Sequence, residues 1–195
     1  MGSVRHASLL RIFACLLLAH SLCQAADSGF FLGPNRDSTY PDGDIPLTWR
    51  DKPPKIKWQR DVGYGFSGIT VCGKRALIAG YDAKRKTNVL YCVSANTGRE
   101  YWRVEYADTC GGPRNGICGP IATPVTDGYR VFMTAAMGRL YCFKLSSGAE
   151  LWEQSVNANS NSCVPHGAFG DGVSPVIVGD LVIANLTASA DSAEW

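Results

Sequence analysis

The sequence predicts an all-β fold: a β-propeller of four-stranded blades, here an incomplete ring of about three blades. The first observation is an internal repeat. "LYCVSANTGREYW" (Leu90–Trp102) and "LYCFKLSSGAELW" (Leu140–Trp152) share Leu, Tyr, Cys, Gly, Glu and Trp at a constant offset of 50 residues (140 − 90). The second is a series of three strand–turn–strand patterns, over Ser67–Ala79, Ala122–Thr134 and Val173–Asn185. A period of this size, built only of short strands, is typical of propellers.

Each repeat is expected to supply four strands. One strand enters a glycine turn, the second leaves it, the third covers Leu-Tyr-Cys, and the fourth ends near a tryptophan. Alternation along the third strand places Leu90 and Cys92 on one face of the sheet and Tyr91 on the other. The hairpins "NTGRE" and "SSGAE" put a glycine where the backbone can take a positive φ. The repeat positions expected to be structural are Trp58, Trp102, Trp152, Gly98, Gly148, Tyr91 and Tyr141.

The tryptophans are the largest side chains at a repeated position. Trp58 in "IKWQRDV" matches Trp102 and Trp152 of the two clear repeats. Large apolar rings that recur once per unit favour packing between neighbouring blades.

The N-terminus is expected to direct export. Arg5 and Arg11 precede a short apolar run, Ile12–Ala19, and Ala25 occupies the small position before a cleavage site. The run is too short for a membrane span, and bulky Leu22 disfavours a lipid anchor at the next residue. We therefore expect a signal peptide over residues 1–26, an N-terminal extension over 27–57 and a partial propeller over 58–195. The mature chain, periplasmic or extracellular, would then have no transmembrane segment.

The charge balance argues against a nucleic-acid partner. The chain has 19 Lys and Arg and 17 Asp and Glu, and the signal removes two arginines and no acid. The mature chain is therefore neutral and lacks the basic footprint that nucleic acid requires. The only dense basic run, Lys84–Lys86, is expected to be a solvated loop tip.

The cysteines suggest a disulfide without fixing it. Cys110 and Cys118 bracket a loop of glycine and proline, and export would allow them to pair. Cys163 in the equivalent loop of the next repeat is a rival partner. Cys92 and Cys142 share one strand position and are expected to be small buried side chains. No role is assigned to Cys72, Cys163 or His166, and no zinc or thiol redox motif is present.

Gly63, Gly65 and Gly68 have the spacing of a dinucleotide-binding fingerprint. That fingerprint requires a helix after the glycines, whereas the residues that follow are β-branched and show no helical period. We expect these glycines to turn the chain in a blade-entry loop, as Gly111–Pro120 and Pro165–Gly172 do for the next two blades.

The pattern "A-x-T-G-x-x-x-W" at Ala95–Trp102 resembles the PQQ-like, or quinoprotein-type, propeller repeat. The opening "FFLGPNRDSTYPDG" is similar to secreted bacterial members of that class. The resemblance covers Phe30 to Asn185. It departs from the family pattern where Ser94 and Lys144 replace the usual hairpin aspartate.

The resemblance implies a non-catalytic module that binds or scaffolds partners, like the propeller subunit of the outer-membrane protein assembly machinery. The alternative is a fragment of an alcohol or sugar dehydrogenase that uses pyrroloquinoline quinone with calcium. In that branch adjacent cysteines line the site, and here no two are adjacent. Asp127 and Asp171 are better explained as turn residues. No catalytic residue, metal site or cofactor is therefore expected. A third interpretation, the sensing part of a receptor, requires further sequence.

The number of blades is small for a ring. Residues 27–195 hold about three repeats of 50, whereas closed propellers typically have four to eight blades. We therefore expect a truncated chain, or one whose ring is closed by missing blades or by a protein partner.

Overall fold

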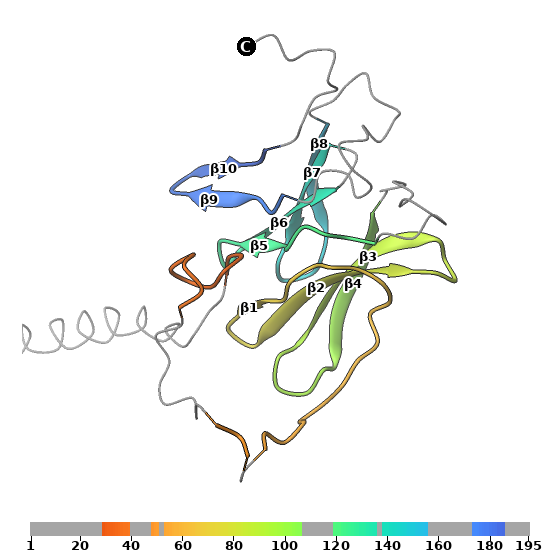
Figure 1. Cartoon of the computed structure of the whole chain (residues 1–195). Coiled ribbons are helices and arrows are strands. Elements are labelled where there is room, and N and C mark those ends of the chain that lie inside the picture. Colours follow the sequence, from red (N-terminus) through yellow and green to blue (C-terminus); the bar gives the residue numbers. More distant parts are fainter. Residues whose placement is uncertain are drawn as a thin grey trace, which may run out of the picture.

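The computed structural model describes residues 29–39, 48–50, 53–106, 119–135, 138–155 and 173–185. Across these residues every regular element is a β-strand, and the strands form three antiparallel sheets (Figure 1). No helix in the described ranges is long and apolar enough to cross a bilayer. The expected signal peptide, Cys110, Cys118, Cys163, His166 and Asp171 lie outside the described residues.

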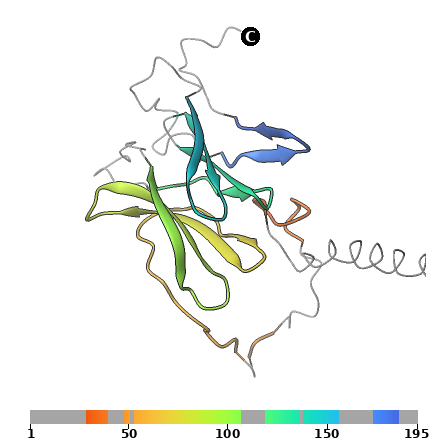
Figure 2. The same cartoon turned by 180° about the vertical axis from the view of Figure 1, so that it is seen from behind.

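Two of the sheets are complete four-stranded blades with strands in sequence order. The first blade consists of β1 (Thr70–Cys72), β2 (Arg75–Asp82), β3 (Thr87–Ser94) and β4 (Glu100–Tyr106). The second consists of β5 (Val125–Thr126), β6 (Arg130–Ala135), β7 (Arg139–Lys144) and β8 (Glu150–Ser155). A third unit contributes the hairpin β9 (Val176–Val178) and β10 (Leu181–Ile183), which Figure 2 shows from behind. The predicted fold class, an incomplete propeller, is thus confirmed.

The blades repeat in register as well as in strand order. Cys92 pairs with Trp102 in the first blade, and Cys142 pairs with Trp152 in the second. In both blades the pairing shifts by one residue immediately after the cysteine, so the bulge recurs with the sequence motif. The 50-residue repeat therefore corresponds to one structural unit.

The core lies between blades. Leu90 and Cys92 of the first blade pack against Tyr141 and Phe143 of the second. Tyr91 lies on the opposite face of the first blade, as alternation predicts. The far face of the second blade, with Leu140 and Cys142, packs against Ile177 and Val182 of the third unit. The second blade thus presents one face to the first blade and the other to the third unit.

Two tryptophans, Trp58 and Trp102, each contact the blade that follows them in the chain. The Trp102 indole nitrogen donates to the Leu145 carbonyl at 2.8 Å, and a Cβ on Gly148 would lie 2.7 Å from its ring. Trp58 makes the same contacts one blade earlier, donating to the Ala95 carbonyl at 2.9 Å and packing on Gly98. The chain around Trp58 therefore lies against the first blade as β4 lies against the second.

A second set of links runs between the segments that enter successive blades. The backbone N–H of Gly68 donates to the Thr123 hydroxyl at 3.0 Å. The backbone N–H of Thr123 donates in turn to the Ser174 hydroxyl at 2.8 Å. These three residues each stand five positions before the glycine of their blade's first turn. The links therefore repeat from blade to blade.

The N-terminal segment, residues 29–39, lies beside β5 and β9 (Figure 1, red-orange). The N–H of Thr126 in β5 donates to the Gly29 carbonyl at 3.1 Å. Arg36 donates to the carbonyl of Ile177 in β9, and its guanidinium lies 4.4 Å from the centre of the Phe30 ring. Leu32, Arg36 and Ser38 have positive φ, and backbone hydrogen bonds close turns within the segment, so its backbone is tightly turned.

Candidate functional site

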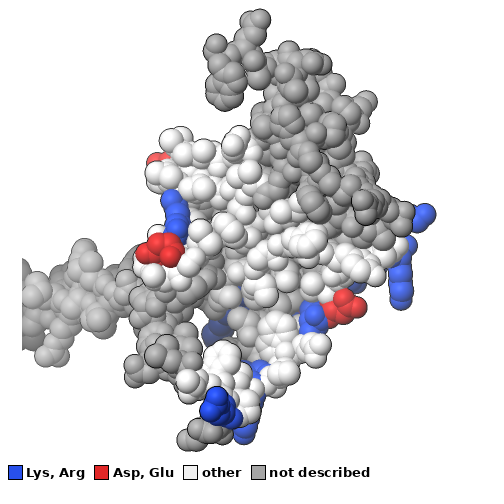
Figure 3. Space-filling view, viewed as in Figure 1, with Lys and Arg blue, Asp and Glu red and all other residues white. Residues whose placement is uncertain are grey.

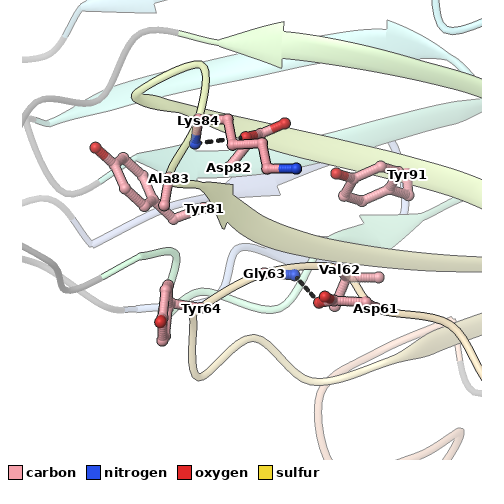
Figure 4. A pocket seen from close by; sticks show the side chains of 9 residues that line it. All are labelled: Asp61, Val62, Gly63, Tyr64, Tyr81, Asp82, Ala83, Lys84 and Tyr91. Carbon is pink, nitrogen blue, oxygen red and sulfur yellow. Dashed lines mark hydrogen bonds between the residues drawn. The ribbon is translucent and has the colours of Figure 1, made fainter.

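The candidate site is a polar pocket of about 480 Å³ beside the first blade (Figure 4). It lies between the chain that enters the blade and the hairpin that joins β2 to β3. Its lining residues are Asp61, Val62, Gly63, Tyr64, Tyr81, Asp82, Ala83, Lys84 and Tyr91. Aromatic, acidic and basic side chains therefore meet around one hollow.

Glycines allow the two sides of the pocket, the chain entering the blade and the end of β2, to come into close backbone contact. Tyr64 and Tyr81 exchange backbone hydrogen bonds of 3.2 and 2.6 Å. A Cβ on Gly80 would overlap the Val62 carbonyl, and one on Gly63, at φ +84°, would overlap the Tyr81 carbonyl. The glycines of the apparent dinucleotide fingerprint thus serve close backbone approach, and strand β1 follows them where a nucleotide site would need a helix.

The two carboxylates are fixed by backbone donors. Asp61 accepts from the N–H of Gly63 at 2.8 Å. Asp82 accepts from the N–H groups of Lys84 and Arg85 at 2.9 and 3.1 Å. The hydrogen bond from Arg85, the largest favourable influence, holds the pKa of Asp82 below its usual value, so this group is an anion at neutral pH.

Tyr91 is the most buried polar group of the pocket, with 6% of its surface exposed. Its hydroxyl points into the hollow (Figure 4). Burial raises the pKa of Tyr91, so the phenol stays protonated and can donate a hydrogen bond. The Arg60 guanidinium lies 5.2 Å from the ring centre and forms an ion pair with Glu100, which fixes its position beside the ring.

A second pocket, of about 540 Å³, is lined mainly by apolar groups. It lies where the N-terminal segment meets the chain entering the three blades. Its lining residues are Phe30, Phe31, Leu32, Arg36, Phe66, Ile121, Val173, Ser174, Pro175 and Val176. Phe66 is 68% exposed, and Phe31 and Leu32 are also exposed. The blade-entry end of the molecule therefore presents an apolar surface.

Charge is otherwise scattered. On the face drawn in Figure 3, Lys and Arg side chains stand singly or in small groups at the margins, some beside an acidic side chain, and most of the described surface is uncharged. No group of three or more His, Cys, Asp or Glu in the part of the chain that the structure describes is arranged to hold a metal ion.

The buried cysteines are inert thiols. Cys92 and Cys142 have no exposed surface and take no part in a disulfide. Burial raises the pKa of Cys92 to about 12 and that of Cys142 to about 11. Both thiols therefore remain protonated and unreactive at neutral pH.

The repeat tryptophans differ in burial. Trp102 is 8% exposed, whereas Trp152 is 40% exposed and approaches Phe132, with ring centres 6.0 Å apart. Gly98 and Gly148 have φ of +69° and +74°, as the hairpin pattern requires. Tyr91 lines the polar pocket, whereas the equivalent Tyr141 is buried between blades.

Sequence reasoning missed the pocket. Asp61, Tyr64, Tyr81 and Asp82 carry no motif, and Lys84 was expected to be only part of a loop tip. A signal was nevertheless present in the repeat. Tyr81, Asp82 and Lys84 fall in a stretch of the first repeat that has no counterpart when the two copies are aligned on Leu-Tyr-Cys and on their turn glycines.

The chain was compared with family models, with curated protein sequences and with solved structures. The family model described as outer membrane protein assembly factor BamB matches residues 85–192. No curated protein sequence matches the chain. Three similar solved structures are BamB from Moraxella catarrhalis, a quinohemoprotein alcohol dehydrogenase from Comamonas testosteroni and a europium-containing methanol dehydrogenase.

These likenesses are distant. The identities are 14%, 16% and 20%, and the TM-scores are 0.39, 0.44 and 0.42, in the same order. The matches cover 62%, 65% and 56% of this chain but only 45%, 17% and 20% of the other chains. The chain thus spans less than half the length of each of these proteins.

Proposed function

Because the chain belongs to the family described as outer membrane protein assembly factor BamB, we propose that it is an exported, non-catalytic propeller module that binds or scaffolds a protein partner. The family description suggests a component of outer-membrane protein assembly as that partner. The alternative is a fragment of a quinone-dependent alcohol or sugar dehydrogenase, and the fold alone supports both.

The observation that favours the binding module is the position of the N-terminal segment. For the dehydrogenase alternative, the resemblance to quinoproteins implies a cofactor bound on the axis of the ring. Here residues 29–39 contact β5 through the Thr126 N–H and β9 through Arg36. Phe30 packs against the core of the second blade, so the segment is part of the folded structure. The chain itself thus contacts both strands on the side where a cofactor on the ring axis would lie.

The apolar blade-entry end gives the module a surface for a partner. Phe31, Leu32 and Phe66 expose apolar area around one pocket. Clustered exposed apolar side chains in loops on a rigid scaffold are typical of protein interaction sites. We infer that the partner contacts this end of the propeller.

A photo-cross-linking residue tests the proposed surface. Placed at Phe66 in the exporting host, it should capture one discrete outer-membrane assembly protein. The matched control is Tyr129, which is 82% exposed and lies in the β5–β6 turn, away from both pockets. Equal capture from both positions, or capture from neither, would contradict the proposal. The cross-linked product is measured by mass spectrometry.

A cofactor titration tests the alternative. The protein as secreted by its host is titrated with pyrroloquinoline quinone and calcium while tryptophan fluorescence is recorded. Dye reduction is then followed with alcohols and sugars as substrates. We expect neither saturable binding nor dye reduction. Stoichiometric binding with substrate-dependent dye reduction would replace the binding module by the dehydrogenase.

A further inference from the structure

The polar pocket is a departure from the blade repeat. In the first blade Ala79 pairs with Leu90, whereas in the second Thr134 pairs with Leu140. Leu90 follows Ala79 by 11 residues, whereas Leu140 follows Thr134 by only 6 residues. The five additional residues extend the first hairpin and bring Tyr81, Asp82 and Lys84 to the pocket. Insertions into single repeats commonly form binding loops.

A second departure keeps the pocket open. Tyr106 stands four residues after Trp102, and its ring packs against Tyr141 with centres 5.6 Å apart. Val62 stands four residues after Trp58 and takes the equivalent place beside Tyr91. The shorter valine leaves free the space that a tyrosine fills at the next blade. The Tyr91 hydroxyl therefore faces a hollow (Figure 4).

The groups around this hollow alternate between donors and acceptors. Tyr91 donates through its phenol, and Figure 4 shows the Lys84 side chain running past Asp82 toward it. Asp61 and Asp82 offer carboxylate oxygens whose positions are fixed by backbone N–H groups. Tyr64, 59% exposed, adds an aromatic face at the mouth.

This combination selects a neutral ligand with many hydroxyls. A free anion would be repelled by two carboxylates, and a free amine would compete with the Lys84 ammonium. Hydroxyl groups both donate and accept, so they can satisfy carboxylates, phenol and ammonium together. Ligand pockets of this size are common, and an aromatic ring accommodates the C–H face of a sugar ring. We propose that the pocket binds a saccharide, independently of the proposed protein partner.

Titration calorimetry with glucose and maltose tests this, with inorganic phosphate and butylamine as charged probes. We expect a saccharide to bind at millimolar concentration and neither charged probe to bind. Tyr91→Phe removes one hydrogen bond and should weaken saccharide binding by about five-fold. Tyr141→Phe, the same change at the equivalent position of the second blade, should leave binding unchanged.

A filling variant gives an independent readout. Val62→Tyr introduces the side chain that Tyr106 provides at the equivalent position one blade later. The added ring should fill the pocket and abolish saccharide binding. The far-UV circular dichroism and thermal unfolding should stay close to those of the parent. Absence of saccharide binding by the parent protein would overturn the proposal. Equal losses in Tyr91→Phe and Tyr141→Phe, or binding of phosphate or butylamine that Val62→Tyr removes, would also overturn it. None of these results depends on whether Phe66 captures a protein.

Discussion

Trp102→Ala is expected to lower the free energy of unfolding by about 3–5 kcal/mol. The Trp102 ring lies between the first two blades and is 8% exposed, so truncation leaves a cavity in the largest cluster of the core. The change also removes the donor to the Leu145 carbonyl. Urea denaturation of the protein, followed by circular dichroism, measures the loss.

Trp152→Ala is the matched comparison. It removes the same side chain from the same repeat position, but here the ring is 40% exposed. If the ring has no contacts beyond the described residues, the loss in free energy of unfolding should be clearly smaller than that of Trp102→Ala. A loss as large as that of Trp102→Ala would show that a further blade or partner covers Trp152. A loss below about 1 kcal/mol for Trp102→Ala itself would mean that the ring does not hold the blades together.

Gly148→Ala is expected to have the second-largest effect, a loss of about 2–4 kcal/mol. The φ of +74° is unfavourable for alanine, and the new Cβ would lie 2.7 Å from the Trp102 ring. The backbone strain accounts for about 1 kcal/mol and the overpacking for about 1–3 kcal/mol. The free energy of unfolding is again measured in urea.

Gly128→Ala separates the two contributions. Gly128 has a φ of +90°, but no atom lies within 4 Å of where its Cβ would stand. This variant therefore carries the strain without the ring contact and should lose only about 1 kcal/mol. Equal losses in the two variants would show that the tryptophan–glycine contact contributes nothing to stability.

The blades were predictable because their signals recur. Leu-Tyr-Cys, the hairpin glycines and the tryptophans return at a constant offset, and strand alternation then fixes which face Leu90 and Tyr91 occupy. Because the same residues recur in each repeat, the strands and turns of a blade can be recognised from the sequence. Both complete blades follow this pattern, and both also have a bulge after the cysteine that the sequence did not predict.

The candidate site was not predictable in the same way. Its residues lie where the first blade differs from the second, so a comparison of the two repeats does not identify them as a site. The pocket also depends on a small residue, Val62, and on the close approach of Gly80 to the Val62 carbonyl, which are properties of the folded chain. The place of the N-terminal segment is similarly set by Arg36 and Gly29, which have no counterpart in the repeat.

In the part of the chain that the structure describes, four links between successive units run in the same direction along the chain. Gly68 donates to Thr123 and Thr123 to Ser174, while Trp58 and Trp102 each donate to a carbonyl of the following blade. An earlier blade thus supplies the donors and a later blade the acceptors. When the chain is delivered from its N-terminus, the donors of each link emerge before their acceptors, so a link can form only after the later blade has emerged.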